Sequence, residues 1–176
     1  MKVNLQEGER TLYKDYPQKA ILVLWFFRSL GIALFIPFFI VPFILMINRS
    51  FMENYLLTYF LIFIPILIIV FAYHIALRRS YTFYITNERV ILEGGILLRK
   101  IKSVPYHKIT DVSIVQNIIE RMLGISSLHV HTAGTGYQLP EIKFFSLANP
   151  EQSQSIIVKE LKTFKADRSQ SATYNE

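Results

Sequence analysis

The chain contains no cysteine among its 176 residues. That absence excludes a disulfide framework, a thiolate metal site and a cysteine nucleophile. It also suits a reducing compartment, because disulfides form and persist in oxidising ones. A chain of this length provides one ordinary domain, or one small domain together with a membrane anchor.

The usual catalytic and nucleotide-binding signatures are missing as well. The sequence has no Walker loop, no Gly-x-Ser-x-Gly elbow, no zinc-protease motif and no Rossmann fingerprint. Gly134-Thr135-Gly136 is too short and isolated to be a phosphate loop. The net charge of +6 would suit nucleic acid, but no nucleic-acid-binding module accompanies it. We therefore expect no catalytic residues, no cofactor and no nucleic-acid partner, and the sequence identifies no small-molecule substrate.

Charge is missing from two long apolar runs in the first half of the chain. Ser29–Ile47 holds no charged residue, and Tyr55–Leu77 holds only His74 as an ionisable group. About 20 apolar residues are needed to cross the hydrocarbon core of a bilayer. We predict membrane-spanning helices at 20–47 and 55–77. The alternative is a pair of buried helices in a soluble protein, but such helices rarely stay apolar on every face.

The short connection between the two runs predicts an antiparallel hairpin, which places both ends of the chain on the same side. Basic residues border the hairpin on that side: Lys2, Arg10, Lys14, Lys19 and Arg28 lie in or after the N-terminal segment, and Arg78 and Arg79 follow the second run. By the positive-inside rule both termini are cytoplasmic, and the protein is a multi-pass protein of the cell membrane. We expect His74, near the inner end of the second helix, to reach the headgroups; a proton relay is the alternative.

The texture of the sequence changes after the second run. Hydrophobic stretches become short and turn residues recur, as is typical of a small antiparallel sheet or barrel. Strands are predicted at 81–86, 89–93, 96–104, 108–116, 128–132 and 141–147, with a short helix at 117–123. Asn149 and Pro150 predict the start of an amphipathic helix that covers the sheet.

The predicted organisation has four parts, and we expect the third to fold without the spans. They are a cytoplasmic N-terminal segment at 1–19, the transmembrane hairpin at 20–78, the β-rich domain at 79–165, and a polar, disordered tail at 166–176.

Several stretches of the β-rich part resemble a known family. They are Tyr84–Ile91, the Glu93-Gly94-Gly95 turn, Val104–Ile109, Glu120–Ile125 and Leu128–Gly134. Their order and spacing resemble the bacterial pleckstrin-homology (PH) domains of YdbS-like membrane proteins. The resemblance implies a membrane-anchored α+β protein, with a two-helix transmembrane hairpin followed by a small PH-like antiparallel β-barrel and a C-terminal capping helix. It carries over no catalytic residue.

Basic residues provide the candidate binding sites. Arg99, Lys100 and Lys102 form a cluster that suits anionic headgroups or an acidic surface of a partner. The alternative is a solvated edge strand whose charge prevents sheet-to-sheet aggregation. Arg78 and Arg79 border the second span, where each can contribute about 1 kcal/mol of attraction to an anionic leaflet.

Two histidines raise the question of a metal site. His129 and His131 lie two residues apart in a predicted strand and therefore point to one face. They would need a third ligand, such as His107 or Glu141, to hold a metal. The alternative is a polar, solvent-facing side of the strand, with no metal bound.

These observations favour a non-catalytic, membrane-anchored binding or scaffolding protein at the cytoplasmic face of the membrane. It would contact lipids through its two spans, and another membrane protein or a second copy of itself through the domain. The alternative is an accessory subunit of a membrane enzyme or transporter complex.

Overall fold

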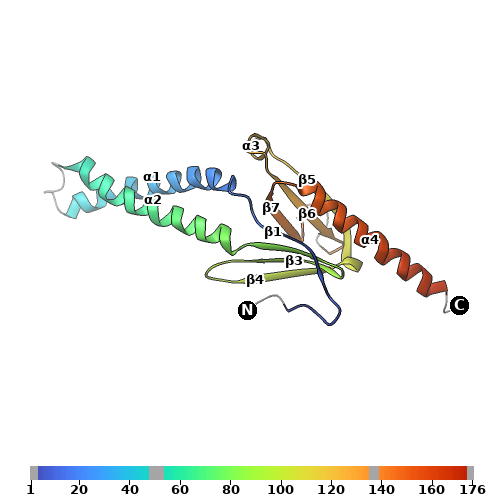
Figure 1. Cartoon of the computed structure of the whole chain (residues 1–176). Coiled ribbons are helices and arrows are strands. Elements are labelled where there is room, and N and C mark those ends of the chain that lie inside the picture. Colours follow the sequence, from blue (N-terminus) through green and yellow to red (C-terminus); the bar gives the residue numbers. More distant parts are fainter. Residues whose placement is uncertain (1–3, 48–53, 135–138, 174–176) are drawn as a thin grey trace. The chain divides into compact units, whose positions relative to one another are not determined.

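The computed structural model describes residues 4–47, 54–134 and 139–173 (Figure 1). The chain forms two compact units. One comprises residues 21–78, and the other combines residues 1–20 with residues 79–176.

The first unit is a pair of helices, α1 (Ile21–Ile47) and α2 (Tyr55–Ser80). Both are long and apolar enough to cross a membrane, at the positions that the sequence predicts. A buried stripe recurs every four residues along α1: Ser29, Ala33, Pro37 and Val41. Small side chains at helical spacing let two helices approach closely. Large apolar side chains cover the outer faces of the pair instead.

A polar contact joins the two helices within this unit. Ser29 Oγ lies 3.0 Å from Nδ1 of His74, and the His74 ring packs 5.4 Å from the ring of Trp25 between centroids. The expectation that His74 reaches the headgroups is therefore wrong, because its side chain is buried against α1. The sequence signal for this contact is Ser29, a polar residue in the first apolar run whose hydroxyl faces His74 from α1.

In its described residues, the second unit contains two antiparallel sheets and three helical segments. The first sheet has the order β1 (Thr11–Asp15), β2 (Thr82–Thr86), β3 (Arg89–Gly94) and β4 (Lys100–Pro105). The second has the order β5 (Ile109–Val115), β6 (Ser126–Thr132) and β7 (Ile142–Leu147). The helical segments are η2 (Tyr106–Lys108), α3 (Ile118–Met122) and α4 (Pro150–Thr173).

The core of this unit lies between the facing sides of the sheets and α4. Phe83 of β2 stacks on Phe144 of β7, with ring centroids 4.6 Å apart. Leu128 and Val130 of β6 are fully buried, as is Ile157 of α4. Along β2 the buried Phe83 and Ile85 alternate with half-buried residues, and the covering role of the C-terminal helix follows the sequence prediction.

The structure differs from the sequence prediction at the N-terminal segment and in the first sheet. The segment 1–19 contains β1, which pairs with β2. Its pattern is weak, and its partner lies beyond the helical hairpin, so only tertiary structure reveals it. The strand predicted from Ile96 begins at Lys100, because Gly95 has a φ of +107° and opens a turn.

The remaining differences concern the end of the chain and the closure of the sheets. The helix predicted to end near Lys165 continues to Thr173. The tail is polar, but it contains neither glycine nor proline to stop a helix. Within the described residues the two sheets form no continuous ladder, so the fold is a PH-like α+β arrangement of two sheets rather than a closed barrel.

Candidate functional site

The helical hairpin interrupts the first sheet between two of its neighbouring strands. Asp15 of β1 pairs with Phe83 of β2, and Lys14 pairs with Tyr84. The chain between these strands is the pair α1 and α2. Since β1 ends where β2 begins, the chain leaves for α1 and returns from α2 at the same end of the sheet. The domain is thus joined to the helices by two covalent connections at one end.

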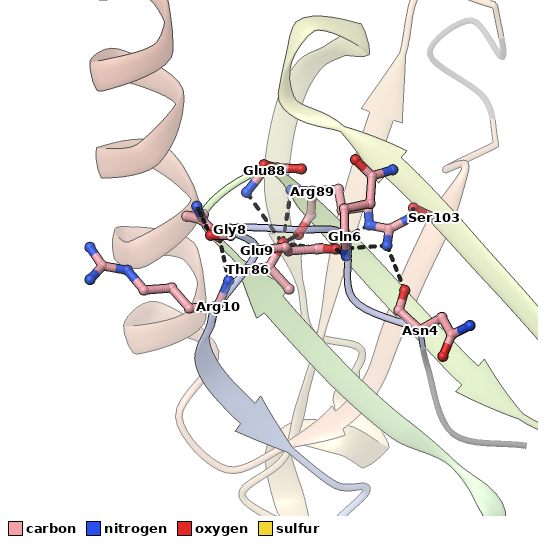
Figure 2. Close-up of polar contacts among 10 residues, drawn as sticks. Asn4, Gln6, Gly8, Glu9, Arg10, Thr86, Glu88, Arg89 and Ser103 are labelled. Atoms are coloured by element: carbon pink, nitrogen blue, oxygen red, sulfur yellow. Dashed lines mark hydrogen bonds and ion pairs between the residues drawn. The ribbon is translucent and has the colours of Figure 1, made fainter.

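The N-terminal segment is fixed at the opposite end of this sheet by one buried carboxylate (Figure 2). Glu9 accepts hydrogen bonds from Arg89 Nε at 2.8 Å and Nη2 at 2.7 Å, from Thr86 Oγ1 at 2.8 Å and from the Gln6 amide at 2.8 Å. Arg89 Nη2 also donates to the Asn4 carbonyl at 3.0 Å. The hydrogen bonds from Arg89 lower the pKa of Glu9 from 4.5 to about 2. These bonds occupy both carboxylate oxygens, so this group has a structural role and is not poised for proton transfer.

The structure separates the three basic residues of the predicted cluster. Arg99, in the β3–β4 turn, forms an ion pair with Glu93. Lys102 Nζ donates to the Glu141 carbonyl at 3.0 Å and lies 3.5 Å from its carboxylate. Lys100 forms no ion pair within the described part of the chain. The cluster is therefore not one uniform patch, since Lys102 links the first sheet to the second.

The other predicted basic residues lie in the last turn of α2. Arg78 is half-buried and Arg79 is exposed. They directly follow the apolar part of the helix.

An open cleft of about 540 Å³ lies beside the contact between Lys102 and Glu141. Its described lining is Ser103, Val104, His107, Lys108, Thr110, Thr132, Ala133, Gly134 and Glu141. The cleft borders β4, which is an edge strand of the first sheet. His107 and Lys108 provide donors and Glu141 provides an acceptor, a combination suited to polar groups of a partner. Lys108 was not predicted as a site residue, because the cleft forms between two sheets and has no local sequence signal.

The two histidines of β6 share one face, as predicted, with ring centroids 6.2 Å apart. His131 is buried rather than solvent-facing, and its Nε2 lies 3.5 Å from Ser113 Oγ. Burial lowers the pKa of His129, and the nearby Lys143 and His131 lower it further. Among the described residues no three His, Asp or Glu side chains gather in a possible metal site. His107 and Glu141 line the cleft instead.

Two antiparallel sheets, a short internal helix and a C-terminal helix define a PH-like α+β protein with two long apolar helices. The bacterial PH domain family matches residues 22–161, and the chain belongs to this family. The match includes both apolar helices and every strand except β1. No curated protein matches the chain. No solved structure matches it either.

Proposed function

We propose that this chain is a non-catalytic, membrane-anchored binding module. Its hairpin spans the cell membrane with both termini in the cytoplasm, and its PH domain docks another membrane protein or a second copy of the chain. The observation that carries this proposal is the insertion of two membrane-length helices between the paired strands β1 and β2. A sheet interrupted in this way can be held at a membrane surface by two connections.

Such an anchor changes what the domain needs in order to bind. A partner in the same membrane meets the domain at high effective concentration, so a modest contact surface is sufficient. The cleft beside β4 supports this role, because an edge strand offers unpaired backbone groups to an extended segment of a partner. Ser103 and Val104 pair with Ile91 and Val90 in the first half of β3, and His107 and Lys108 follow β4. The cleft thus lies away from the end at which the helices join the sheet.

A co-purification experiment on the full chain tests this proposal. Differently tagged copies would be coexpressed, crosslinked in cells and recovered in mild detergent, and co-purifying membrane proteins would be quantified by mass spectrometry. His107→Ala with Lys108→Ala should reduce recovery of the partner or second copy several-fold without changing the amount of chain in the membrane. Lys159→Ala with Lys162→Ala, on the exposed side of α4, is the matched control and should change nothing.

Two further variants separate the basic residues. Arg99→Ala with Lys100→Ala leaves the link between Lys102 and Glu141 intact, and it tests the predicted basic cluster without disturbing the connection between the sheets. Unchanged recovery with the cleft variant would show that the cleft is not the docking surface. Failure of the wild-type chain to recover any partner or second copy would contradict the binding-module proposal itself.

A further inference from the structure

The three most exposed apolar side chains among the described residues of the domain occur in two short segments. In the β3–β4 turn, Leu97 is 91% exposed and lies between Ile96 and Leu98, which are also exposed. In α3, Ile118 is 81% and Met122 is 82% exposed. Exposed apolar surface concentrated in this way indicates contact with a membrane or a partner.

Strand register places the β3–β4 turn at the end where the chain returns from α2. Thr82, at the start of β2, pairs with Glu93, near the end of β3. The backbone N–H of Gly95 then donates to Ser80 Oγ at 3.2 Å. Ser80 is the last residue of α2, and Tyr81 alone separates it from β2. The apolar turn therefore extends beyond the first residues of the sheet on that side.

Register in the second sheet places α3 at the end where the chain leaves for α1. Helix α3 joins β5 to β6, whose first residue Ser126 pairs with Leu147 at the end of β7. The neighbouring Ser146 accepts a hydrogen bond through its carbonyl from the Gln18 amide at 2.8 Å. Gln18 lies between β1 and α1. Each apolar segment thus lies at the end of its sheet where the chain leaves for α1 or returns from α2. Together they are called the apolar end: Gly95–Arg99 and Ile118–Met122.

The charged residues within and beside these two segments differ in exposure, mostly according to their sign. Arg99, Lys100 and Arg121 are exposed, whereas the carboxylates of Glu93 and Glu120 are buried. Glu93 is occupied by Arg99, and Glu120 accepts hydrogen bonds from the Asn117 amide and Ser127 Oγ. Glu151 is exposed in the first turn of α4 at this end too, so the exposed charged groups named here are three basic residues and one acidic residue. Exposed apolar side chains with basic neighbours match the boundary between acyl chains and anionic headgroups.

We propose that the apolar end lies in the interfacial region of the leaflet from which the hairpin emerges, with its Ile, Leu and Met side chains inserted among anionic lipids. This proposal rests on the membrane anchor of the proposed function and adds a defined orientation for the domain. Lipid is the favoured occupant because both covalent connections to membrane-length helices leave from this same end. The cleft beside β4 would then face away from the bilayer and stay open to a protein partner.

The cysteine-free sequence allows a direct test on the full chain. Leu97→Cys, Met122→Cys and Leu139→Cys would each be labelled with an environment-sensitive fluorophore and reconstituted in vesicles of phosphatidylethanolamine and phosphatidylglycerol. Leu139 is the matched control, since it is 71% exposed but precedes β7 at the opposite end of the second sheet. Labels at Leu97 and Met122 should be quenched by nitroxide-bearing lipids. Their quenching by aqueous iodide should be several-fold weaker than at Leu139.

Three other outcomes would overturn the proposal. Equal iodide quenching at all three positions, with the chain still resistant to alkaline extraction, would exclude insertion while leaving the anchor intact. Extraction of the chain by alkali would remove the anchor and with it both proposals. Protection of Leu97 and Met122 that increases with the protein-to-lipid ratio would assign the apolar end to a second copy of the chain.

Discussion

The buried carboxylate of Glu9 is held by the guanidinium of Arg89, 80 residues further along the chain, at 2.8 Å from Nε and 2.7 Å from Nη2. This bidentate pair fastens the residues before α1 to the β2–β3 turn, on the far side of the helical hairpin in sequence (Figure 2). The N-terminal segment is thus an integral part of the PH domain.

Replacing Glu9 by Gln should destabilise the domain by about 2–3 kcal/mol, because the half-buried Arg89 guanidinium loses its buried counter-charge. The urea midpoint of the full chain in mild detergent, followed by pulse proteolysis, measures this loss. Glu7→Gln is the control, since Glu7 is exposed, and it should have little effect. Equal midpoints for the two variants would contradict the structural role of the pair.

The same pair predicts a pH dependence. Arg89 lowers the pKa of Glu9 from 4.5 to about 2, so the folded state favours the charged carboxylate more than the unfolded chain does. The stabilisation is complete above about pH 4.5 and is lost as the pH falls towards about 2. The difference in midpoint between the wild type and Glu9→Gln should therefore shrink over this range. A difference that stays constant would show that Glu9 is not the titrating group.

Dissection of the chain tests the contribution of β1. A fragment of residues 80–165 lacks β1 and leaves one edge of β2 unpaired, so we now expect it to aggregate or to melt without cooperativity. Residues 4–20 joined by a short Gly/Ser linker to residues 79–173 should give a soluble domain with a cooperative thermal transition. Equal melting behaviour of the two fragments would contradict the assignment of β1 to the domain.

The local patterns in the sequence predicted most of the elements. The two apolar runs and the Asn149-Pro150 helix start each act within a few residues, and each predicted its element correctly. Strand β1 was not predicted, because its ladder and the Glu9–Arg89 pair both join residues on opposite sides of the hairpin. No sequence pattern within a few residues of either partner predicts such a pairing.

The basic cluster and the apolar end likewise depend on tertiary structure that local sequence patterns do not predict. Arg99, Lys100 and Lys102 are close in sequence, yet the alternation of β4 and the turn at Gly95 give them different neighbours. Lys102 contacts Glu141 and so links the two sheets. The number of charged residues in the sequence could not have predicted this contact. The apolar end was missed because Ile96–Leu98 was assigned to a strand, and α3 to an ordinary capped helix.

The contact between Ser29 and His74 predicts coupling within the hairpin. Ser29→Ala should weaken the pairing of the two helices by about 1 kcal/mol. The double variant Ser29→Ala with His74→Leu should be destabilised little more than the more destabilised of the two single variants, because both substitutions remove the same contact. Trp25, the only tryptophan, packs on His74, so its fluorescence during unfolding in SDS reports on this contact. Gly31→Ala on the exposed side of α1 should be neutral or slightly stabilising. Additive effects of the two substitutions would show that the residues act independently.

The most direct test of the membrane-anchored account is the labelling of single cysteines by a membrane-impermeant maleimide in intact and lysed bacterial cells. Ser50→Cys, between the two helices, should be labelled in intact cells after the outer membrane is permeabilised. Leu139→Cys, in the PH domain, should be labelled only after lysis, because the hairpin returns the chain to the cytoplasmic side. Labelling of Leu139→Cys in intact cells would contradict the predicted orientation, and labelling of both positions only after lysis would contradict a spanning hairpin.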